Sequence, residues 1–164
     1  MMKKFFIAAI ISTFCFGAPS SGQDKGLQKE IEAVYAKRQK AILDKDFARL
    51  KSDLTADYTE KTKSGTIRNR READADTDHL SAIIKEVFAY TIKVVTVEEG
   101  KDKAINVETT DSGEFDFVGP DNTTHRLVGK GRQRDTWIQV DGELKMKYHE
   151  ELESTAQVDG KPVN

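Results

Sequence analysis

The chain has 164 residues, which is enough for one domain with a substantial core and short for two. Charged residues make up 33% of it and hydrophobic residues 37%, a balance typical of a globular domain with a well-solvated surface. The net charge is −2, and acidic and basic residues are interspersed without a basic stripe, so we expect no nucleic acid partner.

Residues 1–22 have the pattern of a secretory signal peptide. Two lysines precede an apolar run from Phe5 to Phe16, and small residues suited to signal peptidase follow it. The run is too short to span a membrane and no later segment is longer, so we expect no membrane span. Cys15 is the only cysteine and lies in this run. We therefore expect cleavage between Pro19 and Gln23 and a secreted or periplasmic protein without disulfides.

The mature chain divides into a domain at residues 23–154 and a loose C-terminal tail at 155–164. Its first segment, residues 23–45, carries apolar side chains at three- and four-residue spacings, which predicts an amphipathic helix. A second, shorter helix follows, with Asp44 or Asp46 as its N-cap.

A small hairpin and a third helix come next. Residues 58–62 and 66–68 have strand composition around a Lys-Ser-Gly turn. Asn69 and Glu72 have the spacing of a capping box, which predicts a helix that runs to about Glu86.

The rest of the chain has the pattern of four antiparallel strands. They begin with residues 87–98, which are rich in β-branched and aromatic side chains, and continue with residues 105–117, where apolar side chains share one parity. The last two strands flank Asp141 and Gly142, a pair that is typical of a tight type I′ hairpin turn.

This turn fixes the register of the last hairpin, because Val140 then pairs with Glu143. One face receives the pairs Trp137–Met146, Asp135–Tyr148 and Gln133–Glu150. The opposite face receives Ile138–Lys145, Thr136–Lys147, Arg134–His149, Arg132–Glu151 and Lys130–Glu153. The second set has the character of a solvated, charge-paired surface. The first set combines apolar side chains with a carboxylate, a phenol and an indole, which is typical of the wall of a small-molecule pocket.

Helices gathered before a run of strands predict an α+β fold in which the helices cover one face of a curved sheet. This order, together with Arg134-Asp135-Thr136-Trp137 and the Asp141-Gly142 turn, resembles the nuclear-transport-factor-2-like superfamily, in particular its SnoaL-like members. The resemblance spans roughly residues 27–152. The family pattern is T-D-x-W followed by D-G-x-W-x-I; Asp135-Thr136-Trp137 reverses part of it, and Leu144 replaces the second tryptophan.

The resemblance implies a cone-like half-barrel, in which a curved antiparallel sheet wraps a cavity and helices pack over its concave face. It also implies a homodimer, because members of the superfamily often pair through their sheets. The superfamily contains isomerases, dehydratases, hydrolases, cyclases and proteins without catalytic activity, so the resemblance assigns no single function.

The predicted ligand-binding residues are those that the hairpin register and the start of the sheet place toward the cavity: Tyr58, Asp135, Trp137, Met146 and Tyr148. Asp135 and Tyr148 are also the candidate catalytic pair, because a carboxylate in an apolar cavity acquires a raised pKa that suits an acid or base. The alternative is that Tyr148 satisfies Asp135 by a structural hydrogen bond. Tyr58 is either a cavity residue or a core aromatic, and Trp137 is either a packing residue or a stacking platform.

The sequence offers no metal or cofactor motif. The three histidines, His79, His125 and His149, do not converge in the predicted register, which argues against zinc. The acidic run that begins at Asp74 has the opening of a calcium loop but lacks its glycine and its final glutamate. A phosphate loop, a nucleophile elbow and a cysteine nucleophile are all missing from the mature sequence, so we expect no cofactor.

Three hypotheses of function follow. The first is an exported binding or accessory domain whose cavity holds a small apolar or amphipathic molecule. The second is a cofactor-independent lyase, isomerase or hydrolase that uses Asp135 as acid or base and Tyr148 to orient it or to stabilise an oxyanion. The third is a structural dimer whose cavity is filled by side chains.

Overall fold

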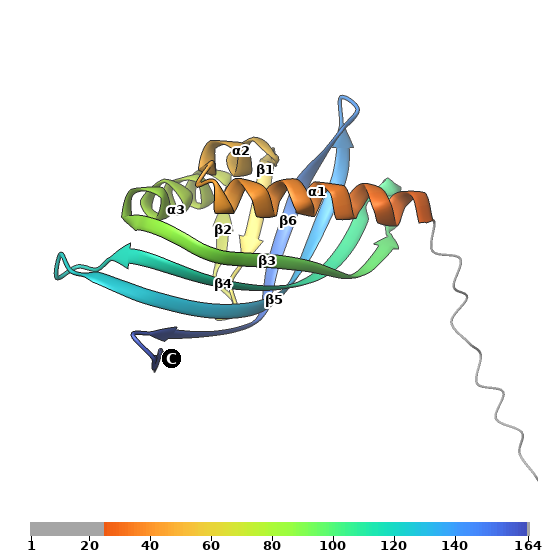
Figure 1. The fold of residues 1–164 in the computed structure, drawn as a ribbon. Helices are drawn as coiled ribbons and strands as arrows, with labels where there is room; N and C mark the ends of the chain where they lie inside the picture. The colour runs from red at the N-terminus through yellow and green to blue at the C-terminus, as the bar shows by residue number, and fades with distance from the viewer. Residues whose placement is uncertain (1–24, 164) are drawn as a thin grey trace, which may run out of the picture.

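Three helices lie on one side of a strongly curved sheet in the computed structural model of the chain, which describes residues 25–163 (Figure 1). The predicted signal peptide at residues 1–22 lies outside the described residues. The sheet is open rather than closed, and the helices precede most of its strands, so the predicted α+β class and the cone-like shape are confirmed.

The helices are α1 (Lys25–Leu43), α2 (Phe47–Ser52) and α3 (Arg70–Ile83). Asp46 caps α2 by accepting a hydrogen bond from the backbone N–H of Arg49 at 3.0 Å. Asn69 and Glu72 form the predicted capping box at the start of α3. This helix ends three residues earlier than predicted, because Ile84 already has extended backbone angles and begins the next strand.

The strands are β1 (Leu54–Lys61), β2 (Ile67–Asn69), β3 (Ile84–Glu99), β4 (Ile105–Val118), β5 (Thr124–Val140), β6 (Glu143–Val158) and β7 (Lys161–Val163), with a 3₁₀ turn, η1 (Lys101–Lys103), between β3 and β4. Their order across the sheet is β2-β1-β6-β5-β4-β3, and β7 pairs with the far end of β6. The four long strands are antiparallel, as predicted, whereas β1 joins β6 in parallel.

The β5–β6 hairpin begins in the predicted register and then leaves it. Val140 pairs with Glu143, and the pairing runs regularly to Trp137 opposite Met146. A bulge at Lys147 then inserts one extra residue into β6, so that Asp135 pairs with His149. Side chains alternate between the two faces of a strand. One extra residue in β6 therefore moves each side chain beyond it to the face opposite the predicted one.

Several predicted pairs are therefore wrong. Tyr148 pairs with Thr136 rather than with Asp135, and Arg134 pairs with Glu150 rather than with His149. A second irregularity at Leu152 follows, after which Arg132 pairs with Glu153. The observed set beyond the bulges is Thr136–Tyr148, Asp135–His149, Arg134–Glu150, Gln133–Glu151, Arg132–Glu153 and Lys130–Thr155.

Residues 155–163 form strand rather than the predicted loose tail. Strand β6 continues to Val158, and Asp159 and Gly160 turn the chain back into β7 with φ values of 51° and 76°. Val163 then pairs with Ala156. This turn carries the same Asp-Gly signal as the first hairpin, which explains why the chain reverses here instead of ending in a tail.

The core lies where α1 crosses the sheet. Ile31 and Tyr35 of α1 pack against buried residues of four strands, Val97, Ile105, Val107, Trp137 and Met146. The rings of Tyr35 and Trp137 meet edge to face at 5.7 Å between centroids. Along residues 25–163 the helices are too short or too polar to cross a membrane.

Candidate functional site

His149 and Asp135 form a hydrogen-bonded pair on the concave face of the sheet. The Nδ1 atom of His149 lies 2.7 Å from Oδ1 of Asp135. The Asp135 side chain is only 2% exposed, whereas that of His149 is 25% exposed. The pair exists because the bulge at Lys147 turns His149 toward the interior, opposite Asp135.

The second carboxylate oxygen of Asp135 is held by a tyrosine from α1. The hydroxyl of Tyr35 donates to Oδ2 of Asp135, and Nε1 of Trp137 donates to the Tyr35 oxygen at 3.0 Å. Burial raises the pKa of Tyr35, and the charge of Asp135 raises it further, so the phenol keeps its proton and acts as a donor. Both carboxylate oxygens of Asp135 are thus committed, which fixes the carboxylate behind His149.

The pKa of His149 is raised by this arrangement. Burial alone lowers it, but the hydrogen bond to Asp135 and the charge of that carboxylate raise it by more. The nearby Arg38, whose guanidinium lies 5.7 Å from the centroid of the Trp137 ring, opposes the rise. His149 is therefore a stronger base than a free imidazole, and a proton taken up at Nε2 would be stabilised by Asp135 through Nδ1–H.

His149 lines a cavity of about 410 Å³ on the concave face. Within the described residues, its Nε2 atom takes part in no hydrogen bond. The same cavity is lined by Gln133, Asp111 and Tyr90, which lie on successive strands across the sheet. The free nitrogen therefore belongs to a side chain that a small molecule in the cavity could contact.

Asp111 is the second carboxylate of this cavity. Its Oδ1 atom accepts a hydrogen bond from Nε2 of Gln133 at 2.6 Å. Burial raises the pKa of Asp111, and the charge of His149 lowers it in part. Gly131 makes room for this carboxylate, since a Cβ atom there would lie 2.8 Å from Asp111 Oδ1.

The five predicted ligand-binding residues are not gathered in this cavity. Trp137, Met146 and Tyr58 are buried in the core, with exposed fractions of 0%, 3% and 4%. Tyr58 borders a separate shallow hollow between β1 and the start of α3. Tyr148 is half-buried on the opposite face from Asp135, so the expected contact between them is wrong. Of the five, only Asp135 is connected to the cavity, because it is hydrogen-bonded to His149, which lines it.

Sequence reasoning misses His149, Tyr35 and Asp111. A register without bulges assigns His149 to the outer face, and Tyr35 is separated from Asp135 by 100 positions. One signal in the sequence points to the error. In a regular register Glu150 lies beside Gln133 and His149 lies outside, so the phenol of Tyr148 is the only partner of the buried Asp135 carboxylate. Along residues 25–163 no three histidine, cysteine or acidic side chains are arranged so that they could hold a metal ion.

No family model and no curated protein matches the chain. Solved structures do match in fold. A nuclear-transport-factor-2-like protein from Cytophaga hutchinsonii aligns with a TM-score of 0.59 at 18% identity over 76% of this chain and 96% of its own. A candidate scytalone dehydratase from Novosphingobium aromaticivorans aligns with a TM-score of 0.59 at 13% identity, covering 79% and 90%.

A type 2 hexachlorocyclohexane dehydrochlorinase also aligns, with a TM-score of 0.59 at 11% identity over 85% of this chain and 90% of its own. At these identities the alignments show the fold, which is the nuclear-transport-factor-2-like cone, and neither substrate nor reaction. The structures that share this fold include both named enzymes and proteins without a named activity.

Proposed function

We propose that the chain is a cofactor-independent enzyme that removes a proton from carbon in a small molecule, with His149 as general base and Asp135 as its positioning residue. The observation that carries this proposal is the His149 imidazole itself. It is held at Nδ1 by a buried carboxylate, while Nε2 belongs to a cavity-lining side chain without a hydrogen-bond partner in the described chain. A buried, partly paired imidazole is a costly way to stabilise a fold and a suitable way to build a base.

The proposed step is an elimination or an isomerisation. Neutral His149 takes a proton at Nε2 from a carbon next to an electron-withdrawing group. The C–H electron pair either forms a double bond as a leaving group departs, or moves into a carbonyl to give an enolate, which takes the proton back from His149 at a different carbon. Asp135 stabilises the imidazolium that results. Gln133 and Asp111 line the same cavity, where an amide N–H or a protonated carboxyl would donate to a developing negative oxygen or to the leaving group.

Two fold neighbours support elimination over the other reactions that the sequence left open. A dehydratase removes water and a dehydrochlorinase removes hydrogen chloride, and both names describe the loss of a proton and a leaving group. This support is one of fold analogy alone. The residues that carry the proposal differ from the predicted pair, because Tyr148 lies on the other face of the sheet.

Proton wash-out tests the proposal with a panel of compounds, so the natural substrate need not be identified first. Small β-hydroxy and β-halo carbonyl compounds are incubated with the protein in deuterium oxide, and exchange at the α-carbon and loss of the leaving group are followed by NMR. We expect at least one compound to exchange faster than in buffer, and His149→Gln to reduce this rate about a hundredfold or more. Tyr148→Phe is the matched control and should leave the rate unchanged.

Exchange that survives His149→Gln in a folded variant would contradict the proposal, as would a panel in which the wild-type protein never exceeds buffer. The second outcome favours the other candidate function, a binding domain for a small molecule. The specific observation in favour of binding is the cavity of about 410 Å³ itself. Native mass spectrometry of protein purified from its own compartment would then reveal a bound ligand, and the His149→Gln variant would retain the same ligand.

We also propose that the protein is exported. The support is the pattern of residues 1–22, in which lysines precede an apolar run and small residues. N-terminal sequencing of the protein from cell fractions tests this: a mature start between Pro19 and Gln23 in the secreted or periplasmic fraction is expected, and an intact Met1 would overturn it.

A homodimer is our last proposal here, and it rests on the family resemblance. The convex face carries paired charges, among them Arg132 and Arg134, which both bind Glu108 at 3.0 and 2.7 Å. Light scattering across a concentration series tests the assembly. A molar mass of one chain at all concentrations would exclude the dimer.

A further inference from the structure

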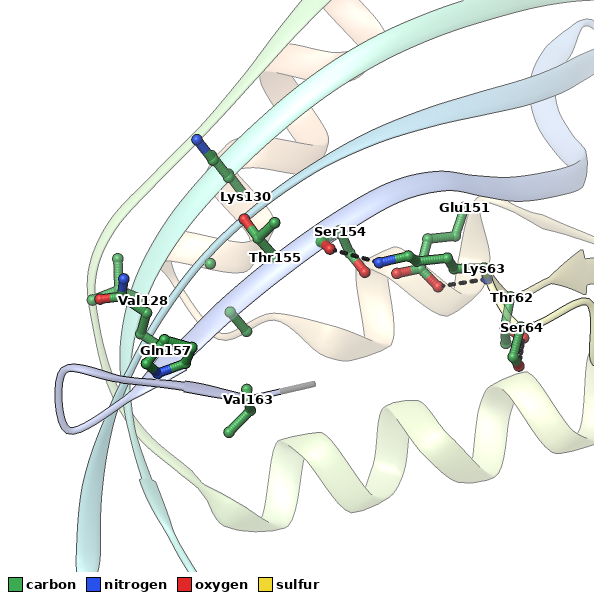
Figure 2. A pocket seen from close by; sticks show the side chains of 13 residues that line it. Thr62, Lys63, Ser64, Val128, Lys130, Glu151, Ser154, Thr155, Gln157 and Val163 are labelled. Carbon is green, nitrogen blue, oxygen red and sulfur yellow. Dashed lines mark hydrogen bonds between the residues drawn. The ribbon is translucent and has the colours of Figure 1, made fainter.

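A second hollow of about 1010 Å³ opens beside the cavity of His149, between the loop after β1 and the C-terminal β6–β7 hairpin (Figure 2). Gly129, Glu151, Ser154 and Ala156 line both spaces, so the two adjoin along β5 and β6. Lys63 closes one side of it: its backbone N–H donates to Glu151 at 2.9 Å and its Nζ to the Ser154 carbonyl at 3.0 Å, as Figure 2 shows.

The floor between the two spaces is made of very small residues. Ala156 pairs with Gly129, and Gly129 pairs with Gly113, so these three residues form one row across the concave face. The rings of Phe115 and Tyr90 cover Gly113. Gly129 is uncovered, since a Cβ atom there would approach nothing closer than 3.5 Å. The row therefore leaves an open passage across Gly129.

The two ends of this passage differ in chemistry. On one side lie the polar groups of the proposed reaction, His149 and Gln133. On the other side most of the exposed lining is apolar, with Leu127 in the first space and Val128, Pro162 and Val163 in the second, where Lys63, Lys130 and Gln157 add polar groups. Val163 lies on the same face as Ala156, with which it pairs, and is 49% exposed. An apolar chain that crosses Gly129 would cover it.

We propose that the substrate is an elongated amphipathic molecule, whose polar, reacting end lies at His149 and whose apolar end crosses Gly129 toward Val163. Gly129 is then the residue that sets the length of the molecule that fits. The assignment of the reacting end rests on the function proposed above. The assignment of the apolar end rests on the adjacency of the two spaces, the uncovered glycine and the apolar side chains of Leu127 and Val163 beyond it.

Straight-chain carboxylates from octanoate to hexadecanoate are suitable probes, because they differ only in apolar length. Six residues of β5, about 20 Å, separate Asp135, the partner of His149, from Gly129, so only the longer members can reach past Gly129. Their binding is followed by the NMR signals of the Leu127 and Val163 methyl groups and of the His149 ring. We expect the His149 signal to respond to every member of the series, and the Leu127 and Val163 signals to respond with the same Kd only to members long enough to cross Gly129. That Kd should fall more than a thousandfold over the series as about eight methylenes are buried. Val95 is 54% exposed on β3 and lines neither space, so its methyl signals should not respond.

Closing the passage is the second test. Gly129→Leu should weaken the binding of hexadecanoate tenfold or more and leave that of octanoate within about twofold, because only the longer probe must cross residue 129. Ser112→Leu is the control: it adds the same side chain at an exposed position of β4 that lines neither space. Circular dichroism verifies that both variants fold.

Equal affinity for all chain lengths, or undiminished binding of hexadecanoate to folded Gly129→Leu, would overturn the proposal. So would Val163 signals that move with protein concentration and do not respond to the longer carboxylates, because a second copy of the chain would then cover that face. His149→Gln separates the two proposals: it abolishes proton exchange if the function is right, and it leaves the dependence of binding on chain length intact if the passage is real.

Discussion

Two histidine–aspartate pairs of equal length and opposite character lie in the described part of the chain. In each, Nδ1 of the histidine lies 2.7 Å from an aspartate oxygen: His149 with Asp135, and His125 with Asp159. His125 also uses Nε2, which contacts Asp121 at 3.1 Å, and it joins the β4–β5 turn to the β6–β7 turn at the surface. His149 uses Nδ1 alone and lines a cavity.

The difference between the two pairs shows that a short contact between histidine and aspartate does not by itself identify a functional site. A histidine whose two nitrogens are both engaged, among exposed carboxylates, holds two turns together. Asp121 accordingly has its pKa lowered to about 2, chiefly by hydrogen bonds from Thr123 and with help from His125. A histidine with one nitrogen fixed by a buried carboxylate and the other left unbound is prepared to accept a proton.

The largest expected effect separates the two histidines by activity. His149→Gln should reduce proton exchange about a hundredfold or more, because a general base contributes about that much. His125→Gln should leave the exchange rate within about twofold, since His125 lies outside the cavity. The measurement is the rate of deuterium incorporation at the α-carbon, followed by NMR with each variant. Equal losses in the two variants would mean that His149 acts only through stability.

Asp135→Asn should cost the fold about 3 kcal/mol, because it removes one partner of a buried hydrogen-bonded pair. Asp159→Asn should cost much less, since that carboxylate is 51% exposed and water replaces its contacts. Urea unfolding followed by circular dichroism gives both free energies. A small loss for Asp135→Asn would show that the buried pair contributes little to stability and would weaken the contrast between the two pairs.

Tyr35→Phe tests the hydrogen-bond chain behind Asp135. It removes a donor to Asp135 and the acceptor of Trp137 Nε1, so we expect a loss of about 1–3 kcal/mol in the free energy of unfolding. Tyr58→Phe is the matched control. Tyr58 is equally buried but donates a single bond of 3.3 Å to Glu60, and its loss should stay below about 1 kcal/mol. Equal losses would mean that the phenol behind Asp135 has no special role.

The smallest expected effect concerns pH. The pKa values of His125 and His149 are both raised in the folded chain, so each histidine stabilises the fold below its unfolded pKa of about 6.5. That contribution is lost as the pH rises through the folded pKa. Ring titration by NMR should give midpoints above about 6.5 for both. Added salt should lower the midpoint of His125 more, because its carboxylates are exposed.

A midpoint of His149 at or below that of a free imidazole would show that burial outweighs Asp135. The rate of proton exchange depends on the neutral form, so it should rise with pH through the same midpoint.

Much of the fold follows from local signals in the sequence. The capping box at Asn69 and the Asp141-Gly142 turn fix the start of α3 and of β6 because each depends on residues three or fewer positions apart. The C-terminal hairpin at Asp159 and Gly160 is predictable by the same rule. The site is predicted less well. The hairpin pattern identifies Asp135, but it selects Tyr148 as its partner and places His149 outside.

The sequence by itself determined the class of the fold, the turns and the alternation of side chains along each strand, because these depend on neighbouring residues. The tertiary structure decided which side chains of each strand face the cavity. The bulge at Lys147 turns His149 inward, and α1 brings Tyr35 to Asp135 across 100 positions. A bulge depends on how a strand must bend against its neighbours, and a contact between distant elements depends on packing. Neither can therefore be predicted from a local sequence pattern.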